Sequence, residues 1–87
     1  MRDSPQLGRL SQRLRTSKAM FVAIWPLLPP ALTSSLRPGP IDEEGWSLLC
    51  ANAAVAAKLR QLVPLLESRL RDAGYPAPIV RIKVLPA

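Results

Sequence analysis

The segment NAAVAAKLRQLVPLLESRLRDAG, residues 52–74, has the pattern of one amphipathic helix. Asn52 is a preferred N-cap residue, and Gly74 suits the position just after a helix, where a positive φ is favoured. Between them the apolar residues recur at spacings of three and four, which places them on one helix face. They are Val55, Leu59, Leu62, Leu66, Leu70 and Ala73, with Val63 beside them. We therefore expect this helix to cover the core of the protein.

Pro64 lies in the middle of this helix, where a proline costs about 3 kcal/mol because a hydrogen bond is lost and the ring clashes with the carbonyl four residues back. On a helical wheel Pro64 is opposite the leucine face, so the freed carbonyl of Arg60 would face water. The helix would then bend with its convex side toward solvent. Curvature of this kind accounts for the proline, and a functional hinge is the alternative.

A second helix is expected to begin with Ser4 as N-cap and Pro5 at the first helical position. Its apolar residues form one stripe: Leu7, Leu10, Leu14, Phe21, Ile24 and Leu28. After Lys18 the polar side disappears, because Ala19, Val22 and Ala23 occupy it, so this half should be covered on more than one side. Trp25 before Pro26 should end or kink the helix. Pro29 and Pro30 should then keep the chain extended.

The sequence of residues 33–51 has the pattern of a β-hairpin. TSSLRPGPID is interrupted by Pro38 and Pro40, as in an edge strand, and DEEG supplies a turn that ends at Gly45. WSLLCA, residues 46–51, has the length and composition of a buried strand. IVRIKV, residues 79–84, alternates, so that Val80, Ile82 and Val84 face one way and Ile79, Arg81 and Lys83 the other.

These elements predict an α+β fold in the order α-β-β-α-β, with a small three-stranded sheet and both helices on one face. With 87 residues the chain forms a single domain, residues 1–87.

Several kinds of chemistry are excluded by composition. The chain has no histidine and one cysteine, Cys50, so neither a zinc site nor a Ser–His or Cys–His nucleophile pair can be assembled. We therefore expect no catalytic residues, no metal, no cofactor and no small-molecule substrate. A single cysteine cannot form an intramolecular disulfide, and a cytoplasmic location is the default.

The segment AMFVAIWPLLPPAL, residues 19–32, superficially resembles the apolar region of a signal peptide. It is shorter than the roughly 20 apolar residues that a bilayer requires, and prolines interrupt it. We expect neither export nor membrane insertion.

The charge is strongly basic: 12 Lys and Arg against 6 Asp and Glu, a net charge of +6 and a pI near 10.8. Such a balance favours a polyanionic partner, namely nucleic acid, an anionic membrane surface or an acidic protein. Simple solubility is the alternative.

The cations of the 52–74 helix fall on its two flanks. Glu67 and Arg71 have the i,i+4 spacing of an ion pair, whereas Lys58 and Arg60 have no acidic residue at that distance. Cations near a helix N-terminus are disfavoured by the helix dipole, so helix stability does not explain Lys58 and Arg60. They either contact a polyanion or form part of a solvated face.

Two further groups of cations are candidates for phosphate contact. Arg81 and Lys83 point away from the expected helical layer, where they would otherwise serve to discourage strand aggregation. The first helix carries the other group along the edges of its apolar stripe: Arg9, Arg13, Arg15 and Lys18.

The aromatic residues do not form a stacking surface. Trp25 and Trp46 occupy positions that should face the core, and one tyrosine, Tyr75, is left. The surface aromatics of single-strand binders and RNA-recognition motifs are therefore missing, as is the Gly-x-x-Gly loop of K-homology domains.

Taken together, AIWPLL at the end of the first helix, the segment AVAAKLRQLVPLL and the closing strand IVRIKV resemble the DciA-like family of bacterial proteins. The resemblance spans nearly the whole chain and is most specific in the second helix and the last strand. It implies a truncated K-homology-like domain in a DNA-binding protein that assists loading of the replicative helicase in DNA replication.

The family's basic positions correspond here to Lys58 and Arg60 in the helix and to Arg81 and Lys83 in the strand. Family members continue past the domain with a basic tail implicated in helicase binding, whereas this sequence ends at Ala87. DNA binding is thus the expected activity, with the helicase as a further partner. A protein-interaction module that docks through residues 19–28, or a K-homology-like protein that binds RNA or ribosomes, are the alternatives.

Overall fold

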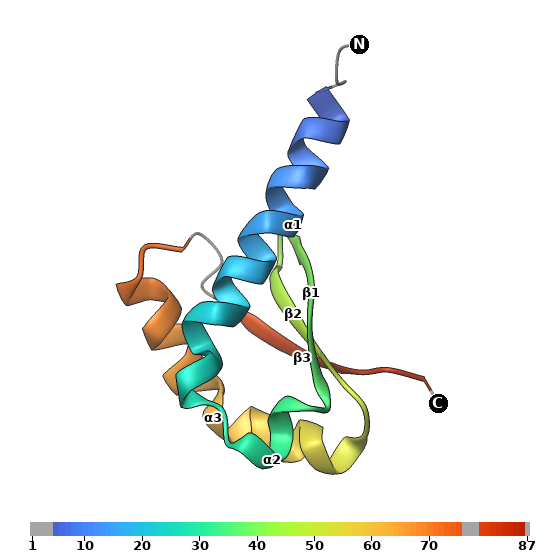
Figure 1. Ribbon diagram of the computed structural model, residues 1–87, viewed down its shortest axis with the longest axis vertical. Helices are drawn as coiled ribbons and strands as arrows, with labels where there is room; N and C mark the ends of the chain where they lie inside the picture. The colour runs from blue at the N-terminus through green and yellow to red at the C-terminus, as the bar shows by residue number, and fades with distance from the viewer. Residues whose placement is uncertain (1–4, 76–78, 87) are drawn as a thin grey trace.

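The computed structural model describes residues 5–75 and 79–86, with the backbone alone for residues 5–7. Helix α1 (Pro5–Ile24) is followed by the 3-10 turn η1 (Trp25–Leu27) and the short helix α2 (Pro30–Thr33). Strands β1 (Leu36–Asp42) and β2 (Gly45–Cys50) precede helix α3 (Ala53–Asp72) and strand β3 (Val80–Val84). The expected α+β order is confirmed, with η1 and α2 added to it (Figure 1). Three features of the sequence prediction lie outside the described residues: Ser4, the side chain of Leu7, and Pro76.

The sheet has the strand order β1-β2-β3, in which β1 and β2 are antiparallel and β2 and β3 are parallel. Residues of β2 alternate between its two faces. Trp46, Leu48 and Cys50 are fully buried in the core that α1 and α3 complete, so both long helices cover one face of the sheet. We call the opposite face, which carries Leu49, the open face.

A buried hydrogen-bonded chain ties α1 to the hairpin. The indole Nε1 of Trp46 donates to the Ser17 hydroxyl at 2.9 Å, and that hydroxyl donates to the Gly39 carbonyl at 2.6 Å. Only glycine fits at position 39, because a Cβ there would lie 2.6 Å from the carbonyl oxygen of Ser47. The three elements are therefore held in one close arrangement around Gly39.

Helix α3 follows its sequence pattern closely. The Asn52 side chain accepts a hydrogen bond from the Val55 backbone N–H at 2.9 Å, and Gly74 has a positive φ of 84°. The apolar residues of the stripe are buried or half-buried except Ala73, the C-cap residue that follows the last turn of α3, which is exposed. Pro64 is exposed and the helix continues through it, as expected for a proline on the solvent side.

The expectation of a buried stripe along the whole of α1 is wrong for its first half. Leu10 and Leu14 are each 55% exposed, whereas Met20 and Ile24 are completely buried. Figure 1 shows that the first turns of α1 extend beyond the sheet, and Leu14, where the helix reaches β1, borders a surface hollow and not the core. The second half packs against both β1 and α3, with Ala19 and Ala23 half-buried, but Val22 is 71% exposed.

The connection from α1 to β1 also differs from the prediction. Trp25 is 47% exposed rather than in the core, and its ring meets Phe21 edge to face with centroids 5.4 Å apart. The helix does end before Trp25, as expected, but η1 turns the indole outward. Pro29 is extended, whereas Pro30 begins α2, because a proline is well accommodated in the first turn of a helix.

The predicted ion pair between Glu67 and Arg71 is wrong. Glu67 Oε2 instead accepts a hydrogen bond from the Val80 backbone N–H at 2.8 Å, at the edge of the sheet. This bond joins α3 to the start of β3. A charged acceptor on a backbone N–H in a part-buried position is worth more than an exposed i,i+4 pair, which explains the choice.

Candidate functional site

The open face carries a row of three side chains, one from each strand. Arg37 of β1 is the register partner of Leu49 of β2, and Leu49 is the partner of Lys83 of β3. Directly paired residues project to the same side of a sheet, so two exposed cations flank one half-buried leucine. This row is the centre of the candidate site.

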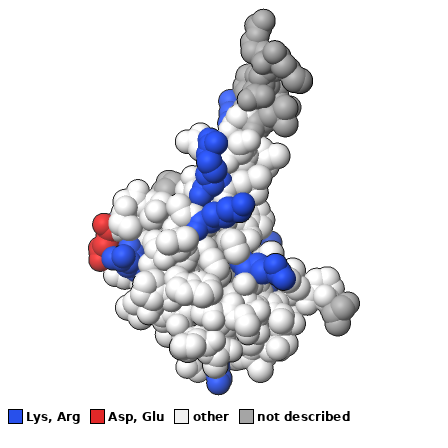
Figure 2. All heavy atoms as spheres, in the orientation of Figure 1, with Lys and Arg blue, Asp and Glu red and all other residues white. Residues whose placement is uncertain are grey.

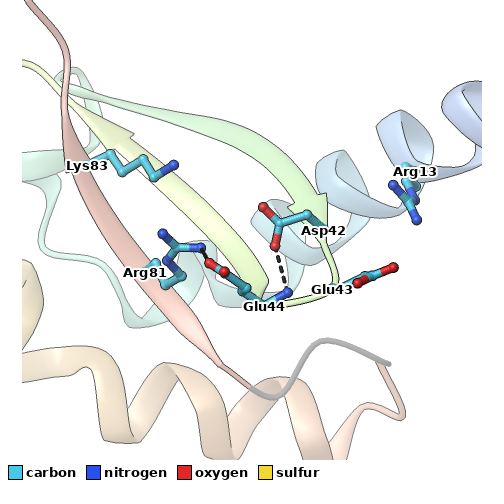
Figure 3. A pocket seen from close by; sticks show the side chains of 6 residues that line it. All are labelled: Arg13, Asp42, Glu43, Glu44, Arg81 and Lys83. Carbon is cyan, nitrogen blue, oxygen red and sulfur yellow. Dashed lines mark hydrogen bonds and ion pairs between the residues drawn. The ribbon is translucent and has the colours of Figure 1, made fainter.

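The next row of the open face is electrically neutral. Arg81, the partner of Ser47, forms an ion pair with Glu44 in which Nη1 and Oε2 are 2.5 Å apart. Glu44 is positioned by the hairpin turn, where its backbone N–H donates to the Asp42 side chain at 2.8 Å. Figure 3 shows Arg81 turned toward Glu44, whereas Lys83 is joined to none of the residues drawn. Arg81 is therefore ion-paired, whereas Lys83 lines the same hollow as the turn acids without an ion pair to any described residue.

The cations of α1 are divided between the sides of that helix. Arg13 lies four residues before the buried Ser17, on the same helix face, and lines a hollow beside the turn acids (Figure 3). Arg9 lines a neighbouring hollow with Arg13 and Ile41. Lys18 lies on the other flank, beside Leu49. Arg15 is two residues from Ser17, which places it on the opposite side of the helix. It therefore points away from the sheet.

In space-filling view, Lys and Arg side chains follow α1 across one side of the molecule, and the acidic side chains visible there are confined to one spot away from it (Figure 2). The sequence of α1 from Pro5 to Ile24 contains no acidic residue, so its cations have no acidic neighbour on the helix itself, although Arg13 shares a hollow with the turn acids.

Lys58 and Arg60 are exposed on α3 but lie on opposite flanks of it. The Lys58 flank faces α1, because Arg69 on that flank donates to the Ala23 carbonyl at 3.3 Å. The Arg60 flank faces β3, because Glu67 on that flank binds Val80. Helix α3 covers the core face of the sheet, so neither cation shares the open face with Lys83.

The structure thus divides the sequence-predicted cations into two surfaces. Arg81 and Lys83 lie on the open face, with Lys18 and Arg13 at its margin, while Lys58 and Arg60 lie on the helical layer. The cations predicted from the sequence did not include Arg37, which the strand register places beside Leu49. Its position next to Pro38 in a proline-broken strand concealed the alternation that would have indicated it.

The described side chains of this site are suited to binding anions. No group of three or more His, Cys, Asp or Glu residues in the part of the chain that the structure describes could hold a metal ion. The side chains that gather are guanidinium and ammonium groups around apolar residues. Such groups attract phosphate or carboxylate oxygens, and Arg can bind either in a bidentate manner.

Glu44 offers a direct test of the charge on the open face. Replacing it with glutamine should release Arg81 and raise the affinity for a polyanion such as DNA about threefold, since one more cation becomes available for phosphate contact. The stability should change by less than about 0.5 kcal/mol, because exposed ion pairs contribute little. Anisotropy titration of wild type and Glu44→Gln with one labelled oligonucleotide measures this, and Glu43→Gln is the matched control. An equal gain in both variants would show that Arg81 has no special part.

Family models, curated proteins and solved structures were compared with this chain, and none matches it. Among the described residues, no helix combines the length and the apolar character that crossing a membrane requires.

Proposed function

We propose that this chain is a non-catalytic DNA-binding accessory protein that holds the phosphate backbone through its open face and α1. The observation that supports it is the position of three cations from different elements around Leu49: Arg37 and Lys83 are its register partners in β1 and β3, and Lys18 lines the same hollow as Leu49. Folding alone does not require cations there, since none of the three belongs to the hydrophobic core. Among the acids of the hairpin turn, Glu44 is paired with Arg81.

The mechanism is electrostatic. Lys and Arg neutralise phosphates and release condensed counterions, which makes binding sensitive to salt and largely independent of base sequence. Assistance at loading of a replicative helicase, in the bacterial cytoplasm, is the more specific role that the resemblance to the DciA-like family supports.

The proposal is tested by titrating labelled single-stranded, duplex and forked DNA across a salt series. We expect the logarithm of the binding constant to fall linearly with the logarithm of the salt concentration, with a slope of about −2 to −4 for the few phosphates that this face can contact. Absence of binding to all three at low salt would contradict the proposal. Stronger binding of competing RNA than of forked DNA would favour the RNA alternative.

A second candidate function is docking on another protein through the end of α1. Val22 and Trp25 are exposed by 71% and 47%, although they are large apolar residues. Such residues gathered in one place are typical of interaction surfaces. Salt-insensitive binding to a purified replicative helicase, without DNA affinity, would favour this function over the first.

A further inference from the structure

A small apolar hollow lies between α1 and β1, at the margin of the open face. It encloses about 250 Å³ and is lined by Leu14, Ser17, Lys18, Pro38, Gly39, Pro40 and Leu49. The lining is mostly hydrocarbon and glycine backbone. Leu14 accounts for one wall and is 55% exposed, so the hollow is open to a ligand from solvent.

The walls of this hollow are held rigidly. Pro38 and Pro40 fix the backbone on one side, because the ring of proline restricts φ. The Ser17 hydroxyl beneath them is engaged at both ends, accepting from Trp46 and donating to Gly39. A ligand would therefore meet a preformed apolar surface, and little ordering of the protein would oppose binding.

Three cations lie in or next to the hollow. Lys18 lines it from α1, and Leu49, which forms part of it, is flanked in the sheet by Arg37 and Lys83. Its described lining contains no acidic residue. A ligand that complements this arrangement has an uncharged apolar face at its centre and negative charges on its periphery.

From this arrangement we infer that the hollow binds one unpaired nucleobase, while Lys18, Arg37 and Lys83 contact the phosphates on either side. The inference rests on the proposed DNA binding and adds to it a preference for single-stranded segments. Every nucleobase presents a π-face that can lie on an apolar surface, whatever its identity. A base within a duplex is stacked on its neighbours and is not available to the hollow.

A second copy of the chain is a poor occupant by comparison, because its own basic open face and α1 would be repelled. An apolar side chain of another protein would fill the centre but leave the surrounding cations without partners. Alternating phosphates and bases satisfy both requirements at once.

The test compares two single-stranded oligonucleotides of equal length and charge, one with bases throughout and one with consecutive abasic sites in the middle. We expect the abasic strand to bind about tenfold more weakly, which is at the lower end of the effect of stacking one base on an aromatic ring. Electrostatic contact alone predicts equal affinity. Anisotropy at a fixed salt concentration measures both.

Two leucines of α1 provide matched variants. Leu14 and Leu10 are each 55% exposed, one helical turn apart, and only Leu14 lines the hollow. Leu14→Ser should abolish the difference between the two oligonucleotides, whereas Leu10→Ser should preserve it. Both variants should remain folded by circular dichroism, since neither side chain belongs to the core.

The outcomes separate this inference from the proposed function. Equal, salt-sensitive binding of both oligonucleotides by the wild type would overturn the nucleobase site and leave DNA binding intact, and the hollow would then suit a protein side chain. The nucleobase site would also be overturned if Leu10→Ser, like Leu14→Ser, bound the base-containing and the abasic oligonucleotide equally well. Binding of neither oligonucleotide would contradict DNA binding itself. Ring-current shifts of the Leu14 and Leu49 methyl groups on addition of the base-containing strand alone would support the site directly.

Discussion

Replacing Trp46 with alanine is expected to lower the free energy of unfolding by about 3–5 kcal/mol. The indole is completely buried, and the substitution leaves a large cavity between the sheet and α1. It also removes the indole N–H that donates a hydrogen bond to the Ser17 hydroxyl at 2.9 Å. A chain of 87 residues has a total stability of about 4–13 kcal/mol at typical values per residue, so the variant should be largely unfolded or close to it.

The second tryptophan is the control for this prediction. Trp25 is 47% exposed and packs on Phe21 at the surface, so Trp25→Ala should cost at most about 1–2 kcal/mol. Urea unfolding followed by far-ultraviolet circular dichroism measures both variants on the same scale. Similar losses in the two variants would contradict the placement of Trp46 in the core and Trp25 at the surface.

Reversing two charges on the open face should weaken DNA binding by at least about tenfold, because groups that attract phosphate are replaced by groups that repel it. The double variant Arg37→Glu with Lys83→Glu changes the cations on either side of Leu49. The dependence of the binding constant on salt should also become shallower, by about one unit of slope for each phosphate that is no longer bound. Anisotropy titrations at several salt concentrations give both quantities.

The matched control reverses the two exposed cations of α3, Lys58→Glu with Arg60→Glu. Each double variant replaces two cations with two anions, so any general effect of the net charge of +6 is altered equally in both. Because Lys58 and Arg60 lie on opposite flanks, away from the open face, we expect only this general effect, a decrease in affinity of about threefold. A larger decrease in the control would move the DNA-binding surface to α3, and unchanged affinity in both would contradict DNA binding through these cations.

Helix α3 shows how much local sequence can predict. Its cap at Asn52, its buried leucines and its glycine after the last turn all depend on residues close in the chain, and each is confirmed. The same holds for the order of helices and strands along the chain. It also holds for the tolerance of Pro64, because a proline on the solvent side leaves a carbonyl that water can satisfy. These features follow from periodicity and from the backbone preferences of single residues.

Helix α1 shows where such prediction ends. Leu10 and Leu14 have the same spacing as the buried Ile24, yet both are half-exposed: the first turns of α1 extend beyond the sheet, and Leu14 borders a surface hollow beside β1 instead of the core. Periodicity indicates which face of a helix is apolar, but not whether another element covers it. The exposure of Trp25 could not be predicted for the same reason.

The sequence by itself determined the α-β-β-α-β order, the strongly basic charge and the composition from which neither catalytic nor metal-binding chemistry is expected. Only the tertiary structure decided which cations meet. Arg37 and Lys83 are far apart in the chain and become neighbours of Leu49 through strand register, while Lys58 and Arg60, close together in the chain, are separated by the helix between them. The physical reason is that charge is a property of each residue, whereas a surface is formed by side chains that pairing and packing bring together from distant parts of the chain.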